Sequence, residues 1–331
     1  MKYPTPSFVP NAILDIAEKR NITAVTHPSN KMMGYIVLPG DKRMYFARTT
    51  LDVNPFGAAT IAKNKSYTRF FLEQEGYSIP KGATCSTAWT EADGTVRDAR
   101  WGAEYAEKIG FPVIVKPNAS SWGRGVYKCQ TKADVEKHLI SLHNEGHECL
   151  VEECVSGFDV RVVIYNGEYF AAYIRTPLSL KGDGVSTVTE LIEKKKEALS
   201  HRDIDIDSQY NRIVFTLERE GYTPESVLEE GTTLTLLDSA NAKTGGDLED
   251  ISDILAPRFR ELAIQSSKAL NLPLCGVDMI IDGDVSKDDS KESIIELNGS
   301  LGFNHYVTLG KEAEDRIYAM FEKIVDDFIQ K

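Results

Sequence analysis

The sequence lacks the features of a membrane-spanning or a disulfide-bonded, secreted protein. No run of about eighteen apolar residues occurs in its 331 residues, so no segment is expected to cross a bilayer as a helix. The five cysteines are odd in number and scattered, which argues against a disulfide framework or a zinc ribbon. The N-terminus has no apolar core of a secretory signal. We therefore expect a cytoplasmic protein in a reducing compartment, with no membrane partner.

Positive charge is also scarce. The chain has 38 Lys and Arg against 50 Asp and Glu, a formal net charge of −12. A nucleic-acid binder held by phosphate contacts is therefore not expected, although an acidic protein can still carry a locally basic site. Internal repeats are missing too. The apolar and charged fractions, 42% and 27%, are those of a globular protein, and the length allows two or three domains.

Two apolar segments near the C-terminus, LCGVDMII (274–281) and SIIELNGSLGFNH (293–305), read as strands joined by a polar turn. Because side chains alternate along a strand, Glu296 and Asn298 share a face, and Asp278 can reach it from the partner strand. Two carboxylates and an amide oxygen suit Mg²⁺. A solvated sheet face is the alternative, although Ile280 and Ile294 are expected on the same faces as the acids. These strands alone leave both interpretations open.

The periodicity predicts further elements along the chain. We expect a small α/β lead-in over residues 1–58, with a helix at 11–21 and strands at 22–28 and 35–49. A sharp turn at Asn166-Gly167 predicts a β-hairpin. The remaining predicted helices cover 54–76, 97–110, 131–146, 187–199, 256–271 and 311–330, and the remaining predicted strands cover 111–117, 148–155, 159–177 and 232–237.

The segment VIVKPNASSWGRGV (113–126) is a strand with Lys116 near its end, followed by a loop with two glycines. Such a loop lets backbone N–H groups approach phosphate oxygens, but the spacing is not that of a Walker P-loop, and a simple turn is the commoner outcome. Further on, LVEECVSGFDVRVVI places Glu152, Glu153 and Asp159 around a short connection. This connection suits adenine and ribose, and a solvated strand end remains the alternative.

Taken together, the motifs resemble the ATP-grasp superfamily. They are Lys65 in NKSYT, the strand IVKP, the loop SSWGRGV, the connection VEECVSGFDVRV, the strand end IRTP, then GDG, N-x-x-x-GG and D…E-x-N, in that order. The stretches KGDGVSTVTELI, GYTPESVLEEGTTLTLLDSANAKTGGDLEDIS and GVDMII…IIELNGSLGFNH resemble the ATP-grasp modules of cyanophycin synthetases and of bifunctional glutathione synthetases. The resemblance covers about residues 60–310.

The resemblance implies an α+β fold of the ATP-grasp type, in which two α/β subdomains clamp ATP behind a short α/β N-terminal domain. It implies boundaries near 1–58 for a substrate or dimerisation domain and 59–331 for the ATP-grasp domain. Within the latter, about 80–155 would form the smaller nucleotide-clamping subdomain. About 156–331 would then form the subdomain that carries metal and substrate.

The resemblance also implies a reaction. A substrate carboxylate takes the γ-phosphate of ATP, and an amine attacks the acyl phosphate to give an amide, ADP and phosphate. Phosphoryl transfer needs mainly positioning and charge neutralisation, which fits these residue types. The implied cofactors are ATP and two Mg²⁺ ions, with Mn²⁺ as a substitute. The implied partners are a small-molecule or peptide substrate that bears a carboxylate, and an amine acceptor.

The matching positions carry the following implied roles. Arg175 and Asn241 are the catalytic candidates, with Arg175 at the acyl phosphate. Asp278, Glu296 and Asn298 are the metal candidates. Arg161, Lys243, Gly245, Gly246 and His305 are the substrate candidates; for Arg161 an internal salt bridge and for His305 a structural role are the alternatives. The nucleotide candidates are Lys65, Lys116, Ser120, Ser121, Gly123, Gly125, Glu152, Glu153, Val155 and Asp159.

The chain departs from these relatives on the acceptor side. It reads NAKTGG where some have N-L-S-T-GG, and NGSLG where some have N-x-x-PG. We expect these changes to bear on the substrate more than on the chemistry. We expect the chain to carry neither the second ligase domain of cyanophycin synthetases nor the glutamate–cysteine ligase of the bifunctional enzymes. Modification of a ribosomal peptide or of a carrier-bound acyl group, a non-catalytic ATP-binding regulator, and a homodimer all remain open.

Overall fold

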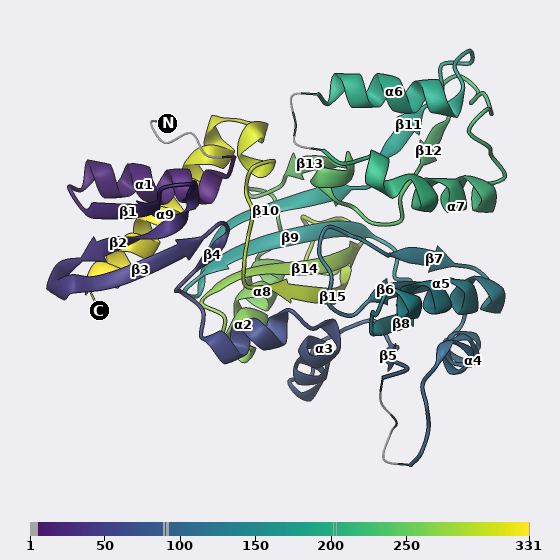
Figure 1. The fold of residues 1–331 in the computed structure, drawn as a ribbon, viewed down its shortest axis with the longest axis horizontal. Helices are drawn as coiled ribbons and strands as arrows, with labels where there is room; N and C mark the ends of the chain where they lie inside the picture. Colours follow the sequence, from purple (N-terminus) through teal and green to yellow (C-terminus); the bar gives the residue numbers. More distant parts are fainter. Residues whose placement is uncertain (1–5, 89, 91–92, 201, 203, 331) are drawn as a thin grey trace.

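A five-stranded antiparallel sheet runs through the middle of the molecule (Figure 1). A computed structural model describes residues 6–88, 90, 93–200, 202 and 204–330. The strands of this central sheet are ordered β13-β10-β9-β14-β15. The hairpin predicted at Asn166-Gly167 joins two of them, and the predicted C-terminal pair forms another two. Their bounds are Phe158–Tyr165 for β9, Glu168–Thr176 for β10, Asp247–Asp250 for β13, Leu274–Asp282 for β14 and Lys291–Asn298 for β15.

The two faces of the central sheet differ in character. One face carries Val160, Val162 and Met279, which pack under α8 (Pro257–Ala269) and α2 (Phe56–Ala62). The other face is apolar only where the C-terminal helix α9 (Lys311–Gln330) covers it. The remainder of that second face is charged, which points to a function other than packing.

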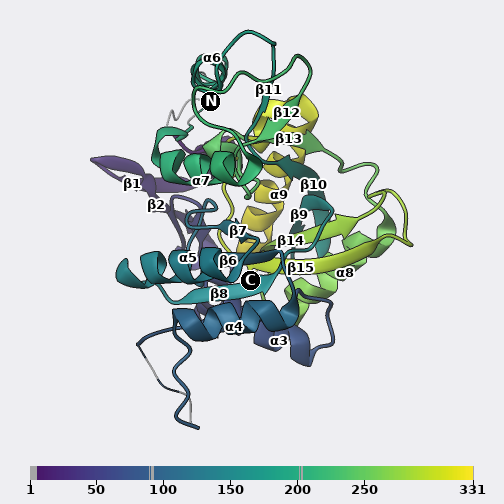
Figure 2. The same cartoon turned by 90° about the vertical axis from the view of Figure 1, so that its right-hand side faces the viewer.

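A second antiparallel sheet, ordered β5-β8-β6-β7, lies beside the central one. Two helices pack against one of its faces, and their apolar residues form a separate core with the strands (Figure 2). The helix α5 starts with the predicted capping box between Thr131 and Asp134. The bounds are Gly82–Cys85 for β5, Val113–Pro117 for β6, Tyr127–Cys129 for β7, Cys149–Glu153 for β8, Ala99–Ile109 for α4 and Lys132–Asn144 for α5.

The lead-in segment folds as one helix and a four-stranded meander. Its apolar residues share a single core with α9, and the rings of Phe8 and Phe321 lie 6.3 Å apart. A short 3-10 turn, η1 (Pro39–Asp41), connects the two central strands where the sequence predicts a turn. The bounds are Phe8–Lys19 for α1, Thr23–His27 for β1, Asn30–Leu38 for β2, Lys42–Ala47 for β3 and Thr50–Leu51 for β4.

A third, small unit is inserted between β10 and β13. It has its own apolar core, built from leucines and isoleucines of two strands and two helices. Two 3-10 turns flank the later part of the chain, η3 (Ala242–Thr244) and η4 (Tyr306–Leu309). The elements of the insertion are β11 (Ser179–Lys181), α6 (Val188–Ala198), η2 (Asp207–Gln209), α7 (Tyr210–Glu220) and β12 (Thr233–Thr235).

The predicted α+β class is confirmed, with three local corrections. The helix predicted over 54–76 is two helices, because the chain breaks at Asn64, whose side chain caps α3 (Lys65–Gln74). The strand predicted over 293–305 ends at Asn298. A β-bulge between the pairs Asp278–Glu296 and Met279–Ile294 turns Ile294 into the apolar core, away from the charged face where it was expected. Among the described residues, no helix is both long and apolar enough to cross a membrane.

Candidate functional site

Neighbouring strands bring charged side chains together on the open half of the central sheet. In register, Asp278 of β14 lies opposite both Arg161 of β9 and Glu296 of β15, while Arg175 of β10 lies opposite Asp159. Arg161 donates from Nε and Nη2 to the two oxygens of Asp278, each at 2.6 Å. Arg175 Nη2 lies 3.0 Å from Asp278 Oδ2, and its Nε donates to Asp159 Oδ1 at 2.9 Å. The salt bridge considered for Arg161 is therefore present.

The charge states follow from burial and from these partners. Burial raises the pKa of Asp159 by more than Arg175 lowers it. Burial opposes ionisation of Glu296 as well, but the positive charges of Lys65, Arg161 and Lys116 outweigh it and lower the pKa of that carboxyl. Burial also works against the charge of Arg161, yet Asp278 raises its pKa. The face thus holds ionised Glu296 among permanent cations.

The three predicted metal ligands meet at one point. Asn298 Nδ2 lies 3.2 Å from Asp278 Oδ2 and 3.1 Å from Glu296 Oε1. The amide nitrogen therefore occupies a position flanked by two carboxylates, which is where a cation would be attracted.

The start of α3 reaches this point from the other side. Lys65 is the first residue of the helix, and its Nζ lies 3.1 Å from Glu296 Oε2 and donates to the Ser120 carbonyl oxygen at 3.1 Å. The backbone N–H groups of Lys65 and Ser66 donate to Asn118 at 3.2 and 2.8 Å, which fixes the helix start at the end of β6. Lys65 therefore joins the glycine-containing loop to the charged sheet face.

A buried ion pair lies on the neighbouring face of the second sheet. Lys116 of β6 pairs closely with Glu152 of β8, and both side chains are buried. Arg69 of α3 lies 3.7 Å from the other oxygen of Glu152. Glu153, one residue on, accepts a hydrogen bond from the Lys81 backbone N–H at 2.9 Å. Glu152 therefore pairs with buried cations, whereas Glu153 accepts a backbone hydrogen bond.

The predicted phosphate loop is packed against a distant segment. Ser120 Oγ donates to the Arg124 carbonyl oxygen at 3.2 Å, and the Ser121 carbonyl accepts from the Arg124 N–H at 3.4 Å. Gly123 has φ +67°, and a Cβ there would lie 2.3 Å from Ser239 Oγ. Only glycine fits this position, both for its backbone conformation and for its close approach. Gly125 also has a positive φ, +69°.

The turn around η3 lies between this loop and the charged face. Asn241 Oδ1 accepts from the Lys243 N–H at 2.8 Å, and Gly245 adopts φ +90°. A Cβ on Gly246 would lie 2.2 Å from the carbonyl oxygen of Thr176, the residue after Arg175. Lys243 Nζ lies 4.9 Å from the ring centre of Trp122 in the loop. The predicted substrate wall therefore contacts the predicted phosphate loop directly.

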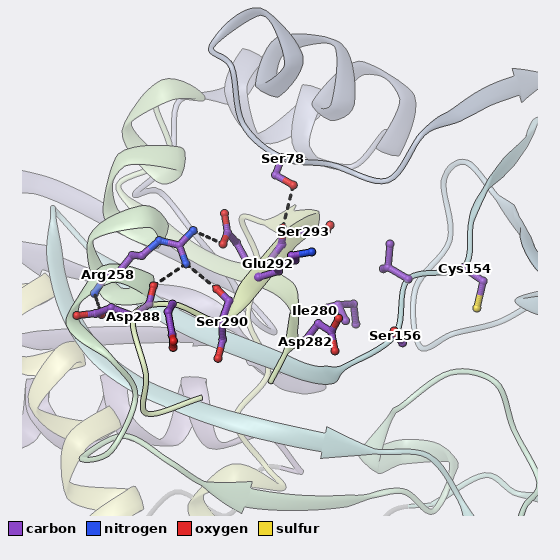
Figure 3. Close-up of a pocket in the computed structure, with 13 residues that line it drawn as sticks. Ser78, Cys154, Ser156, Arg258, Ile280, Asp282, Asp288, Ser290, Glu292 and Ser293 are labelled. Carbon is purple, nitrogen blue, oxygen red and sulfur yellow. Dashed lines mark hydrogen bonds and ion pairs between the residues drawn. The ribbon is translucent and has the colours of Figure 1, made fainter. Parts of the chain in front are cut away.

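The connection after β8 borders a cavity of about 690 Å³ (Figure 3). Cys154 and Ser156 line it at one end, and Arg258, hydrogen-bonded to Asp288 and to the Ser290 carbonyl, lines the other. Val155 is also among the lining residues. Of the predicted nucleotide residues, Val155 is the one that lines this cavity. The last predicted substrate residue, His305, lies just before η4.

Comparison with known proteins gives this arrangement a context. A family model for the D-Ala–D-Ala ligase C-terminus matches residues 85–212. The glutathione biosynthesis bifunctional protein GshAB of Streptococcus mutans is 32% identical over 246 residues, 71% of this chain and 31% of that protein. The cyanophycin synthetase of Synechocystis is 28% identical over 257 residues, 75% of this chain and 28% of that protein. The bifunctional glutathione synthetase of Pasteurella multocida shares the fold, with a TM-score of 0.58 at 21% identity, over 96% of this chain and 44% of that one.

The chain belongs to the ATP-grasp ligase family. The predicted resemblance and fold are thereby confirmed. The chain spans about a third of the length of the curated relatives that it matches. Members of this carboxylate–amine ligase family use ATP and Mg²⁺.

The residue types that meet on the charged face are those that a magnesium ion prefers. Asp278 and Glu296 supply carboxylate oxygens in register, and rotation of the Asn298 amide by 180° would turn its oxygen toward them. Over the described part of the chain, no group of three or more His, Cys, Asp or Glu side chains could hold a metal, so the amide is needed to complete a set of three. Lys65 and Lys116 provide the cations that a triphosphate would need.

Sequence reasoning missed three residues of the loop and its surroundings. Trp122 belongs to the loop and contacts Lys243, while Ser239 lies against Gly123 and Arg212 binds the Val126 carbonyl. Trp122 within a glycine-containing loop was a local signal, since a bulky residue there is unusual. For Ser239 and Arg212 the contacts span about a hundred residues of sequence, and no spacing rule relates them.

Proposed function

We propose that this chain is an ATP-dependent carboxylate–amine ligase. It forms an amide, as a peptide or isopeptide bond, on an amino acid or peptide substrate through an acyl phosphate, and it releases ADP and phosphate. The observation that carries the proposal is the convergence of Asp278, Glu296 and Asn298 within reach of Lys65, which also holds the glycine-containing loop.

Each group has a role under this proposal. When bound, ATP supplies the phosphoryl group that activates the carboxylate. Asp278, Glu296 and Asn298 would hold two Mg²⁺ ions, and Lys65, Lys116 and the loop at 120–125 would hold the phosphates. Arg175 would stabilise the acyl phosphate or the oxyanion of the tetrahedral intermediate, because a fixed positive charge is most effective there. Asn241 and the Gly245-Gly246 turn would form the acceptor wall, together with Lys243.

The domain boundaries follow the same proposal. Residues 59–331 would form the ATP-grasp unit, with about 80–155 as the nucleotide clamp, and residues 1–58 would complete the substrate side or a dimer contact.

The test is release of ADP and phosphate across panels of amino acids and short peptides, in the wild type and in Glu296→Gln. We expect the variant to lose turnover by roughly a hundredfold or more, because a lost metal ligand costs several kcal/mol of transition-state stabilisation. The matched control is Glu249→Gln, an exposed position on β13 of the same sheet, which should keep its turnover.

Two outcomes would contradict the proposal. Turnover that Glu296→Gln leaves unchanged, in a protein with a wild-type circular dichroism spectrum, would refute the metal assignment. ATP binding without phosphate release under every acceptor condition would instead indicate a non-catalytic ATP-binding regulator.

A further inference from the structure

Arg212, in the first turn of α7, is a buried cation. Its side chain is 6% exposed. The guanidinium donates to three neutral oxygens: the Val126 carbonyl at 3.2 Å, Gln209 Oε1 at 2.7 Å and Ser239 Oγ at 2.8 Å. It forms no ion pair with any of the described residues. Its hydrogen bonds are therefore satisfied while its charge is not.

The neighbouring arginine on the same helix shows what a matched pair looks like. Arg219 donates to both oxygens of Asp238, at 2.9 and 2.8 Å. A buried charge without such a partner is costly, and removing one partner of a buried pair costs several kcal/mol. Burial lowers the pKa of Arg212 by more than the charges of Tyr127 and Asp238 raise it. Among the described residues, Arg212 therefore lacks the direct acidic contact that Arg219 has.

Arg212 lies directly behind the phosphate loop. Val126, whose carbonyl it binds, closes the loop, and Ser239, whose hydroxyl it binds, is the group against which Gly123 packs. Arg212 therefore connects the end of the loop, at Val126, to the segment that contains Ser239.

Other contacts join β7, the strand after the loop, to the inserted unit, and we call this contact surface the seam. Asp238 accepts from the Lys128 N–H at 3.0 Å, and Arg219 donates to the Lys128 carbonyl at 3.1 Å. The ring of His138 stacks on Tyr127 at 3.8 Å and meets Phe215 edge-on at 4.4 Å. Arg212 differs from Arg219 because its hydrogen-bond acceptors are neutral, so no ion pair offsets its positive charge beside the loop.

We propose that Arg212 is a positioning residue for the phosphates of ATP, which holds the loop around Gly123 and supplies a positive charge that the triphosphate matches. This inference rests on the proposed function, since it assumes that ATP binds at this loop. Under this inference, the helix α7 of the inserted unit takes part in nucleotide binding, whereas the sequence-based nucleotide candidates all lie outside the inserted unit.

The test compares the affinity for ATP with that for adenosine, which shares the base and ribose but lacks phosphates. Calorimetry on wild type and on Arg212→Gln should show ATP affinity reduced by about tenfold or more, equivalent to about 1.4 kcal/mol, with adenosine affinity unchanged within twofold. Arg212→Lys keeps the charge and should recover most of the ATP affinity. A purely structural role would change both ligands together.

The matched control removes the neighbouring pair, in the double variant Arg219→Gln with Asp238→Asn, which leaves net charge unaltered. We expect lower thermal stability and an unchanged ratio of ATP to adenosine affinity. If the ratio of ATP to adenosine affinity changes equally in this double variant, the effect comes from packing of the seam between β7 and the inserted unit, and the charge role is overturned. A folded Arg212→Gln variant with an unchanged ratio would also overturn the charge role.

If Arg212→Gln does not fold, Ser239→Ala replaces it in the test, because it removes the acceptor between Arg212 and Gly123. Selective loss of ATP affinity in that variant supports the inference, and equal affinities to wild type overturn it. Wild-type protein that binds no ATP would refute the proposed function itself, whereas wild-type ATP binding with unaltered variants refutes only the role of Arg212.

Discussion

Glu296 shows how a single side chain is set by its neighbours. The positive charges around it lower the pKa of its carboxyl against the effect of burial. Because the folded-state pKa lies below the unfolded value, the carboxylate contributes stability above the unfolded pKa, and this contribution is lost as the pH falls through the folded value. At neutral pH the group is ionised and suited to a cation.

His138 predicts a second pH dependence of the unfolding free energy, at higher pH than that of Glu296. Burial lowers the pKa of His138 to about 4, and its Nε2 has no hydrogen-bond partner among the residues that the structure describes. The unfolded state therefore binds more protons than the folded state between about pH 6.5 and 4. The stabilisation is complete above pH 6.5 and falls by about 3 kcal/mol as the pH drops to 4.

Substitution of this ring by Phe tests the assignment. His138→Phe keeps the stack on Tyr127 and removes the titrating group, so we expect the loss of unfolding free energy between pH 7 and 4 to shrink by about that 3 kcal/mol. Urea unfolding at several pH values measures it. The partly buried His147 serves as control, and His147→Gln should follow the wild type. A pH slope identical in all three proteins would refute the assignment.

At the scale of elements, the β-bulge in β15 decides which side chains reach the charged face. One extra residue, Ile295, lets Glu296 stay opposite Asp278 while Ile294 turns into the core. Simple alternation predicts the acids correctly and Ile294 incorrectly, because a bulge shifts the pattern by one residue at a point that no composition rule marks.

The glycine-containing loop carries a second prediction. Gly123→Ala should weaken ATP binding by about tenfold or more, since the new Cβ meets Ser239 Oγ and the backbone at φ +67° becomes strained. The control is Gly146→Ala at the end of α5, with φ +83° and open space around it, which should cost only about 1 kcal/mol of stability. Calorimetric titration and thermal unfolding separate the two effects. Equal ATP affinities would show that the loop does not hold the phosphates.

At the scale of the whole molecule, α3 connects the two sheets at the site. Its first residue, Lys65, reaches Glu296 on the central sheet, and Arg69, one turn on, reaches Glu152 on the second sheet. These two cations pair with carboxylates of the protein. Binding of a triphosphate would therefore exchange partners on both sheets at once.

This exchange predicts a magnesium-dependent stabilisation. At free nucleotide a hundredfold above its Kd, mass action should raise the unfolding free energy by about 2.7 kcal/mol. We expect most of this gain to disappear on chelation of Mg²⁺, because the triphosphate would then face Asp278 and Glu296 unshielded. Thermal unfolding with ATP and either Mg²⁺ or EDTA measures it, and Glu296→Gln should lose the difference. Equal shifts in both conditions would contradict the magnesium site.

The sequence predicts much of this molecule where the signal is local. The hairpin at Asn166-Gly167, the capped helix from Thr131 and the shared face of Asp278 and Glu296 all follow from short-range rules. What it does not predict depends on contacts between distant segments. The pairing of Arg175 with Asp159 requires the strand register, and the placement of Arg212 requires the docking of the insertion.

The shared core of α1 and α9 has a consequence for how the chain matures. Phe8 packs on Phe321, and Lys19 donates to Tyr318 Oη at 2.9 Å, so the first helix is covered by residues about three hundred positions later. During synthesis, which proceeds from the N-terminus at about 5–20 residues per second, the apolar face of α1 has no cover for the tens of seconds before α9 leaves the ribosome. Chaperone protection of nascent chains should matter more for α1 than for the second sheet with α4 and α5, whose own core is complete by residue 151.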